Sequence, residues 1–373
     1  MNLKICHLTS VHSIDDVRIF LKECTSLAAN GFDVTLIACG DTSFEDIKNG
    51  VKRISLCVPV KNRLHRMIKR TRAVYRRALK VNAKIYHFHD PELLPVGRKL
   101  KKMGKIVVYD SHEDTAVLIK SRDWIPMMIR YFLSPIYAYY ENQIVRDFDA
   151  IITVTPSIVE KFKKMNSNTY QVTNFPIIDT TTFNKQKIER RNICFAGNIT
   201  HSYMLENVIT SLSKTVGVKL ILAGEPMSNH YLNVLKNTDG WNKVEYLGRI
   251  SHGAVNVLYS QTLIGIACLG YLASIGYKQG TLGVLKLFEF MNAGMAVICT
   301  DSVLWKEIVD KENCGLCVNP YEIDEISNAI QYLVDNPKIA LEMGINGRKA
   351  VKREYNWESQ EKILIELYRN ISN

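Results

Sequence analysis

Residues 280–290, GTLGVLKLFEF, followed by residues 291–300, MNAGMAVICT, decide how the chain is expected to fold. Residues 284–293 predict a buried helix that ends at Gly294, and residues 295–299 predict a buried strand directly after it. A loop, a helix and an apolar strand in close succession are typical of a domain with a parallel sheet. The stretch therefore predicts an α/β fold.

The same stretch also predicts a ligand site. Gly280 and Gly283 allow the backbone to approach a ligand closely, and the start of a helix offers free N–H groups to a phosphate. Lys286 and Glu289 lie three residues apart and share a helical face, one able to neutralise phosphate and the other to accept hydrogen bonds from ribose hydroxyls. A tight loop leading into an ordinary buried helix explains the stretch equally well.

Apolar runs alternate with helical patterns along the whole chain. The runs read as strands at residues 3–9, 33–38, 51–58, 84–89, 105–110, 149–154 and 170–174, and then at 192–196, 218–223, 243–247, 263–269, 295–300 and 315–318. A polar connector, residues 179–191, separates the two series. We therefore expect two doubly wound domains facing each other across a cleft, an N-terminal domain of residues 1–180 and a C-terminal domain of residues 181–356. The last helix, about 357–373, is expected to cross back to the first domain.

Composition excludes several classes of protein. The chain has 373 residues, 47% hydrophobic and 23% charged, which is ordinary for globular proteins. Its apolar stretches are too short to span a bilayer, and its N-terminus lacks the pattern of a secretory signal, so we expect a cytoplasmic protein. Nine cysteines spread thinly along the chain indicate reduced core residues.

The net charge of +11 owes most to the segment between Lys61 and Lys84, which contains no acidic residue. Its apolar residues recur at helical spacing, so it predicts an amphipathic helix with a cationic face. Such a helix suits an anionic membrane surface, which the protein would contact from the cytoplasm, although a helix packed on the sheet with a solvated outer face fits the same spacing. Nucleic acid is not expected as a partner, because no nucleic-acid-binding signature accompanies the charge.

Seven strings occur in an order and spacing that resemble bacterial glycosyltransferases of family 4. They are HFHDPELLPVG, IVVYDSHED, FDAIITVTPSI, KLFEFMNAGMAVI, WKEI, NCGLCVNP and EYNWE. The resemblance implies a GT-B fold and retaining transfer of a sugar from a nucleoside diphosphate donor, UDP first among the options. It implies no cofactor and no required metal.

The resemblance also implies a donor site in the C-terminal domain. Glu289 matches the second carboxylate of the family's Glu-x7-Glu pattern and would bind the ribose, whereas Thr281 stands at the first. Basic residues that clamp the diphosphate in the family are replaced here by Asn198 and Tyr203. The donor-binding residues implied are Gly197, Glu225, Arg249, Ile250, Thr281, Leu282, Gly283, Lys286 and Glu289, of which Lys286 and Glu289 are also assigned to catalysis.

The N-terminal domain would bind the acceptor, a glycan or a polyprenyl-linked sugar. His89 follows a strand, in a loop, and by family analogy positions the transferring sugar as a catalytic residue. His12, Asp16, Arg18 and His112 are assigned to the acceptor. Arg18 suits a lipid diphosphate, and pairing with Asp15 or Asp16 is equally compatible with its position. The resulting hypothesis is a glycosyltransferase of surface polysaccharide synthesis, with a non-catalytic subunit that binds a nucleotide sugar or a partner enzyme as the alternative.

Overall fold

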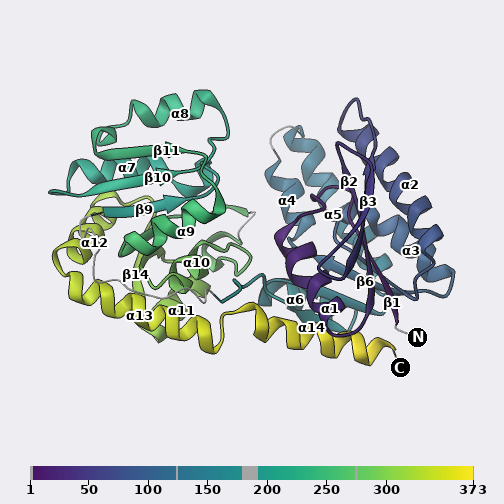
Figure 1. Ribbon diagram of the computed structural model, residues 1–373. Helices are drawn as coiled ribbons and strands as arrows, with labels where there is room; N and C mark the ends of the chain where they lie inside the picture. Colours follow the sequence, from purple (N-terminus) through teal and green to yellow (C-terminus); the bar gives the residue numbers. More distant parts are fainter. Residues whose placement is uncertain (1–2, 123–124, 179–191, 274–275, 373) are drawn as a thin grey trace. The chain divides into compact units, whose positions relative to one another are not determined.

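The computed structural model describes residues 3–122, 125–178, 192–273 and 276–372 (Figure 1). The chain divides into two compact units, one of Met1–Asn174 with Trp357–Asn373 and the other of Phe175–Asn356. The predicted connector, residues 179–191, lies outside the described residues.

The first unit contains a sheet whose described strands run in the order β3-β4-β2-β1-β5-β6-β7-β8. Its strands pair in parallel, except that β3 is antiparallel to β4. The bounds are β1 (Lys4–Leu8), β2 (Asp33–Gly40), β3 (Phe44–Lys48), β4 (Val51–Cys57), β5 (Ile85–Phe88), β6 (Ile106–Ser111), β7 (Ala150–Thr153) and β8 (Thr169–Gln171). The buried apolar runs of the sequence thus form the parallel strands, as predicted.

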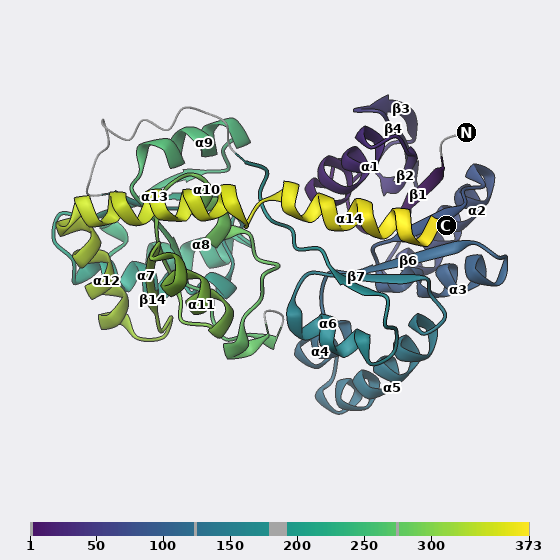
Figure 2. The ribbon, with the colours of Figure 1, turned by 90° about the horizontal axis from the view of Figure 1, so that it is seen from below.

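Helices cover both faces of this sheet. Core residues of α2, α3, α5 and α6 pack together on one face, and those of η1, α1 and α14 pack on the other. Figure 2 shows α14, in yellow, beside α1. The bounds are η1 (Val17–Cys24), α1 (Thr25–Ala29), α2 (Arg63–Val81), η2 (Pro91–Leu93), α3 (Leu94–Lys102), α4 (Thr115–Ser121), α5 (Met127–Val145), α6 (Pro156–Lys163) and α14 (Trp357–Ser372).

The second unit contains a parallel sheet with the described order β11-β10-β9-β12-β13-β14. Strand order reverses direction between β9 and β12, which is where doubly wound sheets bind ligands. The strands are β9 (Asn192–Ala196), β10 (Lys219–Ala223), β11 (Val244–Gly248), β12 (Ile264–Ala267), β13 (Ala296–Thr300) and β14 (Gly315–Val318).

Helices connect these strands in turn, and two buried clusters, one on each face, form the core. The bounds are η3 (His201–Tyr203), α7 (Leu205–Ser213), α8 (Asn229–Lys236), η4 (Trp241–Lys243), α9 (His252–Gln261), η6 (Tyr277–Gln279), α10 (Lys286–Asn292), α11 (Val303–Glu312), α12 (Ile323–Asp335) and α13 (Pro337–Arg353). The helix predicted over residues 284–293 therefore begins two residues later, at Lys286.

Two local features differ from the prediction. Strand β3 was not predicted, because its residues are all exposed and polar in pattern; it forms a hairpin with β4 through Asn49 and Gly50, both at positive φ. Residues 17–30 have a helical pattern in the sequence, but the segment begins as a π-helix, η1, whose backbone bonds join residues five apart, before α1 continues it.

Candidate functional site

Three glycines follow neighbouring strands at the carboxyl edge of the second sheet. The Gly197 N–H donates to the Ala223 carbonyl at 3.0 Å, and the Gly224 N–H donates to the Gly248 carbonyl at 2.7 Å. A Cβ atom on Gly224 would lie 1.7 Å from the Gly197 carbonyl oxygen, and Gly224 has a φ of 144°. Only glycine fits this approach. At this edge of the second sheet the backbone segments therefore pack closely together, and side chains from other elements can lie against them.

Lys286 and Glu289 meet at this edge. They form the predicted pair on one face of α10, with Lys286 Nζ 2.5 Å from Glu289 Oε2. The Lys286 side chain crosses Gly197, because a Cβ atom there would lie 2.8 Å from Lys286 Cε. Both side chains remain partly exposed. The Lys286 ammonium and the Glu289 carboxylate are therefore held together next to the backbone of Gly197.

Two tyrosines border the carboxylate of Glu289. Burial, reinforced by the charge of Glu289, raises the pKa of both Tyr203 and Tyr259 well above the usual value. The Tyr259 hydroxyl donates to the Ala196 carbonyl at 3.4 Å. Tyr203 is thus a neutral residue near Glu289, and Lys286 lies beside that carboxylate.

The loop before α10 is held by its own contacts. Gly280 has a φ of 81°, and a Cβ atom there would meet Ser302 Oγ at 2.5 Å. The Thr281 hydroxyl accepts from the Gly283 N–H at 3.0 Å, and the Thr281 carbonyl accepts from Trp305 Nε1 at 3.0 Å. Leu282 is buried. Thr281 therefore shapes the loop, where the family pattern has a carboxylate.

Glu225 and Arg249 follow β10 and β11 and pair with each other. Arg249 Nη1 lies 3.3 Å from Glu225 Oε2, and both side chains are exposed. Ile250, next to Arg249, packs against the core of this unit. Strand β10 neighbours β9, and β11 neighbours β10, so the pair borders the same sheet edge as Gly197.

In the first unit, His12, Asp16 and His112 come together at the carboxyl edge of the sheet. His12 Nδ1 lies 3.4 Å from Asp16 Oδ2, and the rings of His12 and His112 are 5.2 Å apart. Burial alone would lower the pKa of His12, but the hydrogen bond to Asp16 and the charge of Asp90 raise it. All three side chains are partly exposed, so they can contact a ligand.

Arg18 does not join this group. Its guanidinium is 5% exposed and binds Asp110 through Nε and Nη2, at 3.0–3.1 Å, while Nη1 donates to the Val172 carbonyl at 2.9 Å. The assignment of Arg18 to the acceptor is therefore wrong, because its donors are used inside the domain. The suggested partners are also corrected: Asp15 pairs with Arg53 at 2.6 Å, and Asp16 caps η1 through the backbone N–H groups of Arg18 and Ile19.

His89 follows β5 as predicted, but its side chain is buried, with 2% of the residue exposed. Its Nε2 lies 3.0 Å from His7 Nδ1, and its Nδ1 lies 3.2 Å from Asp110 Oδ2. Burial lowers the pKa of His89 to about 4. In this structure the His89 side chain is therefore not placed to contact a transferring sugar directly. His87 lies in β5 and bonds to the Tyr368 hydroxyl at 2.8 Å.

The sequence interpretation missed Asp110, which is the centre of this edge. Besides Arg18 and His89 it receives His112 Nε2 at 3.0 Å. Burial would raise the pKa of Asp110, but the charges of Arg18 and His112 hold it well below the usual value. Its position at the end of a predicted strand, between Tyr109 and the string SHED, was the available signal.

Two family models match the sequence. The model described as "Glycosyltransferase Family 4" matches residues 18–172, and that described as "Glycosyl transferases group 1" matches residues 179–350. Comparison with curated proteins finds no match.

Solved structures show the same fold at low sequence identity. A sucrose-phosphate synthase from Thermosynechococcus elongatus is 16% identical with a TM-score of 0.77, and the match covers 99% of both chains. WaaG, a glycosyltransferase involved in lipopolysaccharide biosynthesis, is 13% identical with a TM-score of 0.69, covering 98% of this chain and 99% of that one. HepE from Anabaena, in complex with UDP and glucose, is 12% identical with a TM-score of 0.73, covering 99% and 100%.

The two Rossmann-like units define the GT-B class of fold, which confirms the fold predicted from the sequence. With both halves matched by glycosyltransferase models, the chain belongs to the glycosyltransferases of family 4 and is an enzyme of that type.

Proposed function

We propose that this glycosyltransferase uses a nucleoside diphosphate sugar, a UDP-sugar first among the options, and retains the anomeric configuration. The observation that carries the proposal is the Lys286–Glu289 pair lying across Gly197 at the carboxyl edge of the second sheet. Glu289 binds the ribose hydroxyls, and Lys286 faces the diphosphate. Crystal structures of HepE in complex with UDP and with UDP-glucose support a uridine donor.

Lys286 lies where charge develops during transfer. An acceptor hydroxyl attacks the anomeric carbon from the face that the phosphate leaves, so the bond to the phosphate oxygen breaks as the new glycosidic bond forms. The departing phosphate oxygen takes the acceptor proton. The negative charge on the leaving group is stabilised by Lys286 and by backbone N–H groups of residues 280–285, other than those of Gly280 and Gly283, which are bonded within the protein. In this scheme no side chain forms a covalent intermediate.

The acceptor binds the first unit, at His12, Asp16 and His112. These side chains are partly exposed, and they present hydrogen-bond donors and an acceptor of the kind that sugar hydroxyls require. We assign the acceptor to a glycan or a polyprenyl-linked sugar of a surface polysaccharide. A glycan was bound in the structure of TarM in complex with Fondaparinux, α-GlcNAc-glycerol and UDP, a protein of which this chain matches 59%.

The donor proposal predicts a specific thermal shift. A UDP-sugar at about 100 times its Kd is expected to raise the melting temperature of the full chain, because a ligand of the folded state stabilises it by about 2.7 kcal/mol. Glu289→Ala is expected to reduce the shift, since the ribose loses its acceptor. A panel of UDP-, GDP- and dTDP-sugars identifies the base and sugar together.

The matched control is Asp310→Ala, which breaks the exposed Lys306–Asp310 pair of α11 in the same unit. It is expected to leave the shift unchanged. If no nucleotide sugar shifts the melting temperature, the donor proposal is wrong. If a donor binds but no acceptor of any class is glycosylated, the chain is a binding subunit in the pathway.

We also propose that the first unit contacts an anionic membrane through α2 and α5. Val74 and Ala78 are the buried residues of α2, and its cationic side chains lie around exposed Leu64 and Ile68. On α5, Tyr131, Phe132 and Tyr139 are 62–69% exposed.

The two helices pack on the same face of the sheet, since their core residues share one cluster. One supplies cationic groups and the other apolar rings, the two contributions that hold a protein at a lipid surface. Among the described residues, each helix is too short or too polar to cross a bilayer.

Liposome sedimentation tests the membrane proposal. The wild-type protein is expected to sediment with vesicles containing anionic lipid, and a variant with Arg66, Lys69, Arg70 and Arg72 changed to Gln is expected to lose most of that binding, at about 1 kcal/mol per basic group. If the two proteins sediment equally with anionic vesicles, the membrane proposal is wrong. Neutral vesicles are the control for binding through α5 alone.

A further inference from the structure

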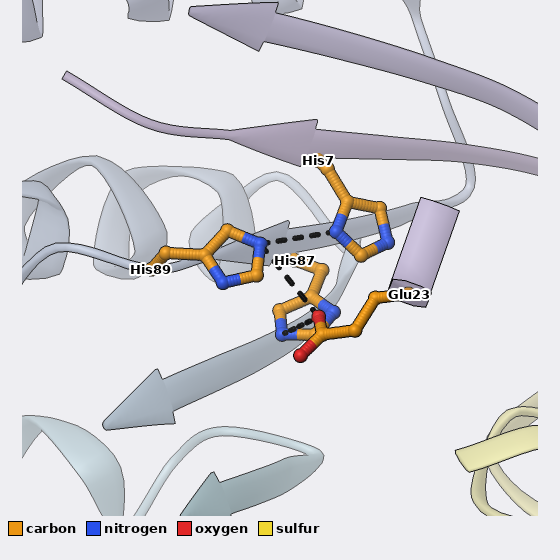
Figure 3. A group of neighbouring side chains, drawn as sticks. All are labelled: His7, Glu23, His87 and His89. Atoms are coloured by element: carbon orange, nitrogen blue, oxygen red, sulfur yellow. Dashed lines mark hydrogen bonds and ion pairs between the residues drawn. The ribbon is translucent and has the colours of Figure 1, made fainter. Parts of the chain in front are cut away.

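Four side chains form a closed polar cluster inside the first unit. They are His7 of β1, His87 of β5, His89 just after β5, and Glu23 of η1, and each is fully buried or nearly so (Figure 3). His7 and His87 are partners in the register of two neighbouring strands, and His89 projects from the same face as His87 because it lies two residues further on. The parallel pairing of β1 and β5 therefore brings three imidazoles together.

The π-helix supplies the fourth member. Its backbone bonds join residues five apart, so Arg18 and Glu23 lie on one face, above the sheet. Arg18 Nε is 3.1 Å from Glu23 Oε1. The second oxygen, Oε2, is directed at the histidines, as Figure 3 shows.

The potential ligand atoms are spaced as a metal site requires. His7 Nδ1 lies 3.0 Å from His89 Nε2, and Glu23 Oε2 lies 3.9 Å from His87 Nε2 and 4.0 Å from His89 Nε2. Ligands around a tetrahedral zinc ion, with metal bonds of about 2.0–2.2 Å, lie roughly 3.4 Å from one another. The four ligand atoms lie within 4.8 Å of one another, so the side chains would have to close in around the ion to complete such a shell.

Within the described part of the chain, this cluster leaves polar atoms without hydrogen bonds. Glu23 Oε2 and the Nε2 atom of His87 are buried and have no hydrogen-bond partner, whereas Glu23 Oε1 has the ion pair with Arg18. Such groups are rare in folded proteins because each loses its hydration without compensation. The two atoms that face each other across the cluster, Glu23 Oε2 and His87 Nε2, are the ones that a cation would satisfy.

The outward nitrogen of each imidazole is already bonded. His87 Nδ1 lies 2.8 Å and His7 Nε2 lies 3.3 Å from the Tyr368 hydroxyl, and His89 Nδ1 lies 3.2 Å from Asp110 Oδ2. Metal-binding histidines characteristically donate their second N–H to an oxygen in this way, which fixes the tautomer and the orientation of the ring. Here one ligand atom of each of the four residues lies within 4.8 Å of the others.

We propose that His7 Nδ1, His87 Nε2, His89 Nε2 and Glu23 Oε2 bind a single zinc ion in a closed, structural site. Imidazole and carboxylate ligands suit zinc, and four protein ligands leave no position open for chemistry.

A second group, His89, Asp110 and His112, is a weaker candidate. Asp110 Oδ2 already accepts from Nε and Nη2 of Arg18, so a metal ion there would lie against a guanidinium. In the proposed site the Arg18 guanidinium contacts Glu23 Oε1, whereas the zinc ion would bind Glu23 Oε2. Zinc would then tie β1, β5 and η1 together beneath the exposed acceptor residues.

Metal analysis of the untagged full-length protein tests the site. After growth with zinc and dialysis, we expect about one zinc ion per chain. A strong chelator is expected to lower the melting temperature, and zinc but not magnesium to restore it, because zinc at about 100 times its Kd raises the folded-to-unfolded ratio about 100-fold. No donor or acceptor is present, so the result is independent of the transfer reaction.

Variants separate this site from adventitious surface binding. Glu23→Gln and His87→Asn are expected to lose the zinc, and Tyr368→Phe, which keeps the shape, to bind it about 10–100-fold more weakly. The control, His230→Asn with His252→Asn, changes two exposed histidines of the second unit and is expected to retain it. The proposal is overturned if the wild type holds no zinc and zinc leaves its melting temperature unchanged, or if Glu23→Gln and Tyr368→Phe bind zinc as the wild type does. The wild-type measurement stands even where a ligand variant fails to fold.

Discussion

Asp110→Ala is expected to lower the free energy of unfolding of the first unit by about 3–5 kcal/mol, the cost of removing one partner from a buried ion pair. Arg18 would remain in the core with one carboxylate, Glu23, and without the two-pronged contact from Asp110. His89 and His112 would both lose Asp110 Oδ2 as a hydrogen-bond partner. Urea unfolding followed by circular dichroism measures the loss, in the presence of a chelator so that metal content does not contribute.

Two variants show whether the buried cation is the cause. Asp15→Ala, which removes an exposed carboxylate from Arg53, is expected to cost less than about 1 kcal/mol. Adding Arg18→Met to Asp110→Leu is expected to recover part of the stability, because hydrophobic residues of similar volume often replace a buried pair without loss. A cost for Asp110→Ala no larger than that for Asp15→Ala would contradict the interpretation.

Lys286→Ala is expected to lower kcat by about 10²–10³ with the preferred nucleotide sugar, the usual effect of removing one group that stabilises charge in the transition state. The expectation depends on the proposed donor. Lys286 is the cation that lies across Gly197 beside Glu289, and its removal leaves the leaving phosphate to the backbone of residues 280–285. Steady-state kinetics separate an effect on kcat from one on KM.

Lys306→Ala is the matched control, since Lys306 forms an exposed pair with Asp310 in the same unit. It should leave both constants unchanged. Lys286→Arg keeps the positive charge, but a planar guanidinium fits the narrow space over Gly197 less well than a compact ammonium. We therefore expect a kcat between those of the wild type and Lys286→Ala. A Lys286→Ala enzyme within about twofold of the wild type would remove Lys286 from the chemistry.

The sequence was sufficient for the parallel strands and for the pairing of Lys286 with Glu289. Buried strands appear in the sequence as continuous apolar runs. Two residues three positions apart on a helix lie on the same face, whatever the surroundings of the helix. The Asn49–Gly50 turn of the hairpin with β3 was also a readable signal, and it was overlooked because β3 has no buried side to reveal it.

The pairing of Arg18 with Asp110 could not be predicted in the same way. The two residues are 92 positions apart, and their contact depends on the strand order and on a π-helix that no periodicity reveals. The burial of His89 has the same origin: its loop position was correct, but the neighbours that cover it come from β1 and η1. Tertiary packing, which local patterns do not encode, decided both.

The π-helix makes the first unit sensitive to chain length at one point. In an ordinary α-helix each residue turns by about 100°, so the same residues wound in that way would place Arg18 and Glu23 about 140° apart. The carboxylate would then swing away from the histidines while the guanidinium stayed over Asp110. An α-helix could bring the two side chains back to one face only by losing one residue between them, so the buried histidine cluster ties the length of this segment to its winding.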